Sequence, residues 1–230
     1  MTIEIPGRGS TSYRFMPQST ALIVIDMQRD FCDPQGVGAM GGEDVSPMRP
    51  IIPKVRAVLD TARASKILVI HTREGHPPDL STLHEMRRLS SRLAGAEIGA
   101  KGPLGRFLVR GEYGHDFVDE LQPKTGEIVV DKPGFGAFFK TDLEKILRDR
   151  GVTQVIVCGV TTECCVQSTI RGAVDRGFFV LTLEDCCASY YPDMHEATMR
   201  VLPAQGNLFG WVGDSQTLIR ALKAYSAEAA

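Results

Sequence analysis

The sequence predicts a three-layer α/β domain built around a parallel sheet, and two observations support this prediction. Short apolar runs alternate with amphipathic segments along the whole chain, and several of these runs are nearly continuous in Val, Ile and Leu. Strands that are buried on both faces have this composition, as in parallel sheets covered by helices. The strand–helix alternation favours right-handed crossovers that place helices on both faces of one sheet.

The apolar runs and amphipathic segments define the individual elements. The expected strands are residues 21–26, 66–71, 127–131, 153–159, 178–185 and 207–212. The expected helices are residues 50–64, 114–121, 142–150, 164–176, 194–203 and 214–225. Thr141 is typical of a helix start, and Gly151 is typical of a helix end.

Length, composition and charge restrict the class of protein. The chain has 230 residues, of which 43% are apolar and 23% charged, so it can bury one core and is unlike a disordered chain. A net charge of -2 gives no electrostatic preference for nucleic acid or anionic lipid. The N-terminal residues lack a signal-peptide pattern, and no apolar run reaches the roughly 18 residues of a transmembrane helix. We expect one cytoplasmic domain over residues 1–230, with flexible tails at about 1–12 and 225–230.

One segment, residues 72–113, interrupts the alternation between the second and third expected strands. It is rich in Gly and Pro, and its residues 81–93 are expected to be partly helical. Its basic residues include Arg87, Arg88, Arg92, Lys101, Arg106 and Arg110. Long connections of this kind are often functional. Two interpretations remain open, namely a lid over an active site and a solvated or subunit-facing surface.

Polar residues stand where the expected strands end. The first strand ends in Asp26, the third is followed by Lys132, and the fourth leads into GVTTECC, which ends at Cys165. Ligands of open α/β sheets bind in the crevice outside the carboxyl ends of the strands. Asp26, Lys132 and Cys165 can therefore meet, although they lie far apart in the sequence.

Such a meeting predicts nucleophilic catalysis by a cysteine. At the start of a helix, unpaired N–H groups and the helix dipole favour a thiolate, and Lys132 is expected to lower the pKa of Cys165 further. Asp26 can accept the thiol proton and pass it to a leaving amine, while backbone N–H groups before Cys165 suit an oxyanion. Taken singly, an aspartate at a strand end is usually a cap or turn residue, and a lysine before proline is usually a surface charge.

The cysteines do not suggest a disulfide framework or a zinc ribbon. None of them forms a CxxC pair, and two pairs are adjacent in the sequence. They are Cys32, Cys158, Cys164, Cys165, Cys186 and Cys187. We interpret Cys186 and Cys187 as packing residues, because free cysteines are most often small buried hydrophobes. The alternative for one member of the set is an activated nucleophile.

Three stretches resemble a known family. ALIVIDMQRDFCDPQG, VVDKPGFGAFFKTDLE and VIVCGVTTECCVQSTIRGAVDRGF are similar to the corresponding segments of isochorismatase-like cysteine hydrolases. The resemblance covers roughly residues 15–222 and includes the three catalytic segments in order. HTREGHPPDL, LVRGEYGHD, LEDCCAS and AQGNLFG look like the biuret and triuret hydrolases within that family.

The resemblance implies a doubly wound fold with six parallel strands, assembled as a homotetramer or homodimer. It implies that Asp26 is the general base and acid, that Lys132 gives electrostatic support, and that Cys165 is the nucleophile. Cys165 is the nucleophile rather than Cys164 because the family pattern runs G-V-T-T-x-x-C, and Cys164 fills a position that is usually apolar. The backbone N–H groups of Thr161 and Cys165 would form the oxyanion hole.

The resemblance further implies a cis peptide bond between Val160 and Thr161. Nicotinamidases in this family bind a metal through an Asp-x-His pair soon after the first strand and a further histidine. Residues 27–65 contain no histidine, so we expect neither a metal nor another cofactor. True isochorismatases lack the nucleophilic cysteine, so the presence of Cys165 favours an amidase.

The substrate contacts are expected from three places in the chain. The side-chain amide of Gln205 complements the N–H and C=O groups of a urea-derived substrate, and biuret hydrolases use a glutamine at this place. The other expected contacts are apolar walls and the polar residues after the second strand, namely Phe31, Phe135, Phe138, Arg73, Glu74 and His76. The alternatives are a surface position at a helix C-terminus for Gln205, core packing for the phenylalanines, and salt bridges to the long segment for the polar residues.

The sequence as a whole predicts a metal-independent cysteine amidohydrolase that releases ammonia from a small linear ureide through a thioester. Biuret and triuret are the expected substrates, with ureidoacrylate and N-carbamoylsarcosine as alternatives. A dinucleotide-binding oxidoreductase is disfavoured, because the turn DMQRDF after the first strand lacks the required glycines. A catalytically silent binding protein is disfavoured by the intact set of Asp26, Lys132 and Cys165.

Overall fold

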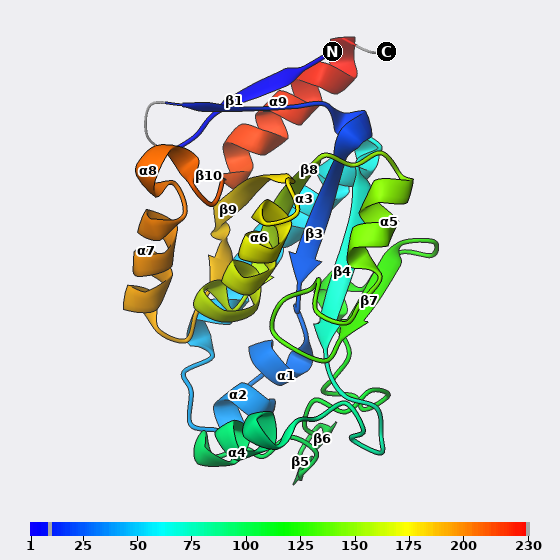
Figure 1. Cartoon of the computed structure of the whole chain (residues 1–230), viewed down its shortest axis with the longest axis vertical. Helices are drawn as coiled ribbons and strands as arrows, with labels where there is room; N and C mark the ends of the chain where they lie inside the picture. Colours follow the sequence, from blue (N-terminus) through cyan, green and yellow to red (C-terminus); the bar gives the residue numbers. More distant parts are fainter. Residues whose placement is uncertain (9–10, 229–230) are drawn as a thin grey trace.

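A six-stranded sheet forms the centre of the molecule. In the computed structural model, which describes residues 1–8 and 11–228, its strands lie in the order β10-β9-β8-β3-β4-β7 and all neighbours are parallel (Figure 1). The strands are β3 (Thr20–Ile25), β4 (Leu68–Glu74), β7 (Ile128–Lys132), β8 (Gln154–Val160), β9 (Phe179–Ala188) and β10 (Trp211–Gly213). The predicted α/β class and its parallel sheet are confirmed.

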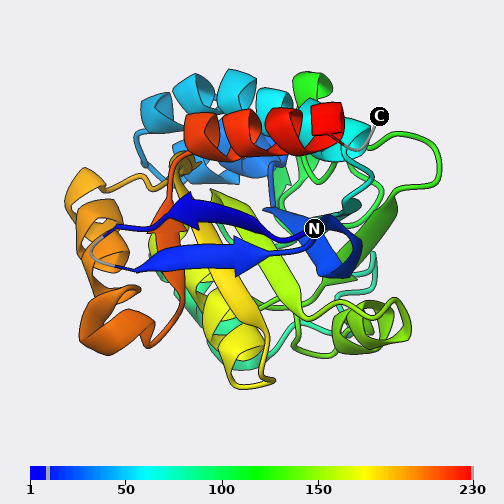
Figure 2. The same cartoon turned by 90° about the horizontal axis from the view of Figure 1, so that it is seen from above.

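Helices cover both faces of this sheet (Figure 2). One face carries α3 (Ile52–Ala64) and α9 (Ser215–Glu228), and the other carries α5 (Leu143–Asp149) and α6 (Gln167–Val174). The remaining helices are α1 (Arg29–Cys32), α2 (Val37–Met40), α4 (Glu85–Leu93), α7 (Pro192–Val201) and α8 (Ala204–Asn207). None of the helices in the described residues has the length and apolarity needed to cross a membrane.

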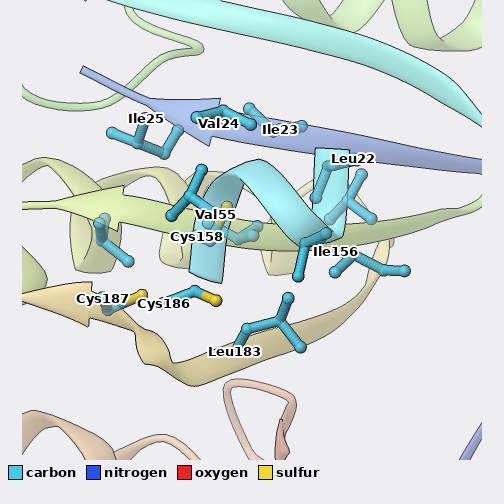
Figure 3. Packing of buried hydrophobic residues seen from close by; sticks show 14 of the residues in the cluster. Leu22, Ile23, Val24, Ile25, Val55, Ile156, Cys158, Leu183, Cys186 and Cys187 are labelled. Carbon is cyan, nitrogen blue, oxygen red and sulfur yellow. The ribbon is translucent and has the colours of Figure 1, made fainter. Parts of the chain in front are cut away.

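The core lies between the sheet and its helices. Every residue of β3 is buried, as expected for a central strand that is covered on both faces. Figure 3 shows Leu22 of β3 and Val55 of α3 within this cluster, together with Cys158, Cys186 and Cys187 from β8 and β9. The interpretation of Cys186 and Cys187 as packing residues is therefore confirmed.

The N-terminal residues form a hairpin, so the expected flexible tail at about 1–12 is wrong for the described residues. Strands β1 (Ile3–Pro6) and β2 (Ser12–Phe15) pair in antiparallel fashion, and β1 lies against α9. Along both strands, buried side chains alternate with exposed ones. The buried side chains are Ile3, Ile5, Tyr13 and Phe15. This period of two predicts a half-buried strand, and its apolar face closes the core beside α9. Of the expected C-terminal tail, residues 225–228 belong to α9, while residues 9–10 and 229–230 lie outside the described residues.

Ile5→Ala is expected to lower the free energy of unfolding by about 2–5 kcal/mol, because it leaves a cavity under the hairpin. Ile5 is only 1% exposed. The matched control is Glu4→Ala, which removes the exposed Glu4–Arg14 ion pair and should cost less than about 1 kcal/mol. Urea unfolding measures both variants. Equal, negligible losses would show that residues 3–6 do not belong to the core.

Two further segments differ from the predicted elements. The expected helix 114–121 reduces to a short 3-10 turn at Asp119–Leu121, because the preceding backbone bonds to the α1 segment instead. There the N–H groups of Arg29 and Asp30 donate to the carbonyls of Asp116 and Gly114. The expected strand 207–212 begins later than predicted, as β10 at Trp211. Its first expected residue, Asn207, belongs to α8 instead.

The long segment 72–113 consists of α4 and connecting loops, with a two-stranded hairpin made of β5 (Lys101–Gly102) and β6 (Gly105–Arg106). Figure 1 shows α4 beyond the carboxyl end of the central sheet, near α1 and α2. The expected helix within residues 81–93 is confirmed from Glu85 onward. The segment therefore lies at the end of the sheet where a ligand is expected.

Candidate active site

The sheet has its topological switch point between β3 and β8. From β3 the chain proceeds to β4 and β7 on one side, and afterwards to β8, β9 and β10 on the other. Asp26 follows β3 directly, and Cys165 lies in the π-helical turn Thr162–Val166 that follows β8. Ligands of open α/β sheets bind outside the carboxyl ends of the strands at such a point. Because the turn Thr162–Val166 leads directly into α6, Cys165 lies at the start of a helical segment, as predicted.

Asp26 and Lys132 form a fully buried ion pair. Both side chains are 0% exposed, and Nζ of Lys132 lies 2.7 Å from Oδ2 of Asp26. The Thr72 hydroxyl donates to the other carboxylate oxygen at 2.6 Å, and Lys132 also donates to the carbonyl of Gly134 at 2.8 Å. Burial raises the pKa of Asp26 even though Lys132 opposes this shift. For Lys132, the nearby carboxylates outweigh burial and raise the pKa.

Glu74 brings a second carboxylate to the same place. It stands opposite Lys132 in the register of β4 and β7, and its Oε2 lies 3.7 Å from Nζ. The thiol of Cys165 donates to the same Oε2 at 3.3 Å, and Arg87 approaches Oε1 to 2.6 Å. Burial acts to raise the pKa of Glu74, but Lys132 and Arg87 outweigh it and lower that pKa to about 2. Glu74 is therefore a carboxylate at neutral pH.

Lys132 acts to lower the pKa of Cys165, as predicted, but the net pKa of the resting thiol is raised, so the expected thiolate is not favoured. A hydrogen bond with Cys164 and burial together hold the pKa of the Cys165 thiol well above its usual value, and the two carboxylates add to this. These effects outweigh the nearby ammonium. The resting nucleophile is a thiol that needs a proton acceptor during attack, as in general-base catalysis.

The same cluster contains donor atoms that a metal ion can use. Ligand atoms of Asp26, Glu74 and Cys165 all lie within 4.8 Å of one another. The ammonium of Lys132 already lies beside both carboxylates, at 2.7 and 3.7 Å, and supplies the positive charge that a cation would bring. A divalent ion placed there would meet this charge at short range. The side chains therefore fit an ammonium-centred site better than a metal centre.

The turn before Cys165 has the geometry that the family resemblance implies. The peptide bond between Val160 and Thr161 is cis. The carbonyl of Thr161 accepts hydrogen bonds from the N–H groups of Cys164 and Val166, both at 3.2 Å. Thr162 contacts Nδ1 of His195 at 2.9 Å, which ties the turn to α7. The proposed oxyanion donors, Thr161 and Cys165, thus belong to one turn, which is held by its own backbone hydrogen bonds and by the contact with His195.

Of the expected substrate contacts, Glu74 lies at the nucleophile and Phe31 lines a neighbouring cavity. Glu74 touches the nucleophile, as described above. Phe31 lines a cavity of about 170 Å³ beside α1, α2 and α4, together with Tyr190 and Arg87. The hydroxyl of Tyr190 donates to the carbonyl of Phe31 at 3.1 Å and holds this wall in place. Phe135, 39% exposed, stacks beneath the guanidinium of Arg87 at 4.3 Å.

Arg73 and His76 are not brought to the nucleophile, so these two expectations are not met. Neighbouring residues of a strand point to opposite faces, and Arg73 therefore points away from the side that carries Glu74. Its guanidinium pairs with Asp131 at 2.8 Å. His76 is 1% exposed and contacts the hydroxyl of Thr82 at 2.8 Å, so it anchors the long segment.

Phe138 and Gln205 also lie away from the site. Phe138 stacks against Phe178 in the core, with ring centroids 6.1 Å apart. Gln205 is exposed on α8, directly before β10, at the amino end of the sheet (Figure 1). Its neighbour Asn207 donates to Thr11 of the N-terminal hairpin at 2.6 Å. Within one chain, Gln205 therefore cannot contact a substrate bound at the opposite end of the sheet.

Sequence reasoning did not single out Arg87. It was one of several basic residues in segment 72–113, and most of the others bond within that segment. Arg88 and Arg92 pair with Glu97, and Arg106 and Arg110 donate to backbone carbonyls. The amphipathic pattern of α4 was the available signal, but it does not show which arginine reaches the sheet.

The fold and the cysteine at its switch point define this chain as a hydrolase with an α/β fold. The family model of the isochorismatase domain matches residues 20–217. A cysteine hydrolase from Pseudomonas syringae pv. phaseolicola is 28% identical with a TM-score of 0.77, covering 91% of this chain and 95% of its own. An isochorismatase family protein from Desulfovibrio vulgaris is also 28% identical, with a TM-score of 0.73 and coverages of 90% and 99%.

A third similar structure is the pyrazinamidase of Pyrococcus horikoshii, solved in complex with zinc. It is 30% identical with a TM-score of 0.66, and the match covers 85% of this chain and 99% of the other. Since the family model spans most of the chain, the chain belongs to the isochorismatase family.

Proposed function

We propose that this protein is a cysteine amidohydrolase that releases ammonia from a small linear ureide such as biuret or triuret. The observation that best supports this proposal is the thiol of Cys165, 3.3 Å from a buried carboxylate and beside the Asp26–Lys132 pair. Such a set provides a nucleophile, proton acceptors and a fixed positive charge among buried side chains. The similarity to a pyrazinamidase supports an amide as the bond that is cleaved.

The first half of the reaction forms a thioester. Sγ of Cys165 attacks the terminal carbonyl carbon, and Asp26 takes the thiol proton. Burial raises the pKa of Asp26, which makes its carboxylate a better proton acceptor. The backbone N–H groups of Thr161 and Cys165 stabilise the oxyanion. The C–N bond then breaks, and Asp26 returns the proton to the departing ammonia. Lys132 holds Asp26 in position throughout.

The second half hydrolyses the thioester. Asp26 takes a proton from water, and the resulting oxygen nucleophile attacks the thioester carbon. The C–S bond then breaks, and Asp26 returns the proton to the sulfur to restore the Cys165 thiol. Biuret and water give allophanate and ammonia, and triuret and water give carboxybiuret and ammonia. Ureidoacrylate and N-carbamoylsarcosine follow the same steps and are the alternative substrates.

The test is ammonia release from biuret, triuret, ureidoacrylate, N-carbamoylsarcosine and nicotinamide, with and without a chelator. We expect release from biuret or triuret, with a rate that changes less than about twofold when the chelator is added, because Lys132 takes the place of a metal charge. Release from another amide would keep the mechanism and replace the substrate. Loss of activity with chelator, restored by added zinc, would contradict the ammonium-centred site.

A further inference from the structure

We propose that Arg87 of α4 is a specificity-determining residue that binds the second carbonyl of a ureide, while Glu74 binds the N–H group beside that carbonyl. This inference rests on the proposed function, because it concerns a substrate attacked by Cys165. It adds a residue from the long segment 72–113 to the site. It also defines the substrate class by two hydrogen bonds that a simple amide cannot form together.

Arg87 contacts the carboxylate beside the nucleophile and lines a neighbouring cavity. Its Nη2 approaches Oε1 of Glu74 to 2.6 Å, and Oε2 of the same carboxylate accepts the thiol proton of Cys165 at 3.3 Å. The guanidinium also lies over the ring of Phe135, 4.3 Å from its centroid, and it lines the 170 Å³ cavity. Arg87 therefore contacts the carboxylate that holds the Cys165 thiol and also forms part of the wall of this cavity.

One donor of Arg87 has no partner within the described residues. Its Nε is buried and makes no hydrogen bond, although Nη2 of the same group is paired. A buried donor without an acceptor destabilises the folded state, so native structures rarely keep one without a reason. An acceptor on a bound substrate would remove this cost. In a neutral ureide such as biuret, the group that can accept this hydrogen bond is a carbonyl oxygen.

The resulting pair of groups matches a ureide in particular. Glu74 offers a carboxylate oxygen, which accepts from N–H, and Arg87 offers the unpaired N–H, which donates to C=O. Biuret carries two carbonyl groups joined by one N–H. When Cys165 attacks the first carbonyl, the bridging N–H lies near Glu74 and the second carbonyl faces Arg87. Acetamide has only the first carbonyl, so it can satisfy neither of these contacts.

The test compares Arg87→Lys with Arg88→Lys, which changes the next residue on the same helix. Arg87→Lys keeps the charge and removes the Nε–H, whereas Arg88 pairs with Glu97 outside the site. For Arg87→Lys we expect KM for biuret to rise on the order of 10- to 100-fold, the effect of losing a charged hydrogen bond. We expect kcat to change less than about threefold, and kcat/KM for acetamide to stay within threefold. Arg88→Lys is expected to leave all these constants unchanged.

A merely structural role for Arg87 would lower kcat/KM for biuret and acetamide by the same factor, and that result would overturn the proposal. An unchanged KM for biuret would overturn it as well. If Arg87→Lys fails to fold, Arg87→Gln replaces it, with the same expected separation between the two substrates. Melting temperatures of both variants verify the fold before kinetics are compared.

A binding measurement separates this inference from the proposed function. In the Cys165→Ser background, calorimetry with biuret reports binding without turnover. We expect Arg87→Lys to weaken the Kd by 10-fold or more relative to Arg87. If the wild type releases no ammonia from any ureide, the proposed function fails, while this titration still decides on Arg87. If biuret binds equally well with and without Arg87, or does not bind, the recognition proposal fails.

Discussion

Cys165→Ser is expected to lower ammonia release by at least about 1000-fold while leaving the fold intact. A serine hydroxyl at this position is a far weaker nucleophile than the thiol, and removal of a catalytic nucleophile typically costs several orders of magnitude. The side chain keeps its shape and its hydrogen bond toward Glu74, so the melting temperature should change little. Steady-state ammonia release and circular dichroism measure the two effects.

Cys164→Ser is the matched control for this prediction. Cys164 is the adjacent residue and is partly exposed, so the same chemical change is made one position away. We expect this variant to keep at least a third of the wild-type rate. Loss of activity in Cys164→Ser with retention in Cys165→Ser would assign the nucleophile to Cys164. Retention in both variants would contradict cysteine catalysis altogether.

Lys132→Met is expected to have the largest effect on stability, lowering the free energy of unfolding by about 3–5 kcal/mol. The ammonium is the charge next to both Asp26 and Glu74, and all three side chains are at most 1% exposed. Its removal leaves Asp26 as a buried carboxylate without its counter-charge. Ammonia release should disappear in the same variant, because Asp26 then binds a proton and cannot accept one from the thiol.

Two comparisons test the cause of this loss. Lys132→Met combined with Asp26→Asn should recover part of the lost stability, because the unpaired charge is removed together with its partner. The single variant should also be less destabilised at pH 5 than at pH 8. Its Asp26 has a pKa above the unfolded value, so the folded state binds the extra proton and gains stability as the pH falls. Urea unfolding at the two pH values measures both effects.

Lys145→Met is the surface control. Lys145 pairs with Asp149 in an exposed i,i+4 arrangement, so its removal should cost less than about 1 kcal/mol. A similar cost for Lys132→Met would show that the Asp26–Lys132 pair contributes no more than a surface ion pair. No recovery in the double variant would attribute the loss to packing of the lysine stem instead of charge.

The central strands and the residues at their ends could be predicted because their signals are local. A run such as ALIVI is apolar at every position, so it forms a strand only where both faces are covered, and β3 is such a strand. Parallel strands end on one edge of their sheet. The positions of Asp26, Lys132 and Cys165 at strand ends therefore predicted their meeting, and the structure brings them together.

The choice between neighbouring polar residues needed the register of the sheet. Arg73 and Glu74 are adjacent, and strand periodicity shows only that they point to opposite faces. The pairing of Glu74 with Lys132 across β4 and β7 decides that Glu74 faces the nucleophile, while Arg73 pairs with Asp131. Gln205 was excluded in a similar way, since α8 precedes β10 and therefore lies at the amino end of the sheet.

The fold class, the six main strands and the meeting of Asp26, Lys132 and Cys165 could be predicted from local patterns, because periodicity and strand ends are properties of short segments. The contact of Arg87 with Glu74 and the raised pKa of the resting Cys165 thiol could not be predicted in this way. Both results depend on distances and burial between segments far apart in the chain. Electrostatic interactions change severalfold with those two quantities, and a linear pattern of residues contains neither.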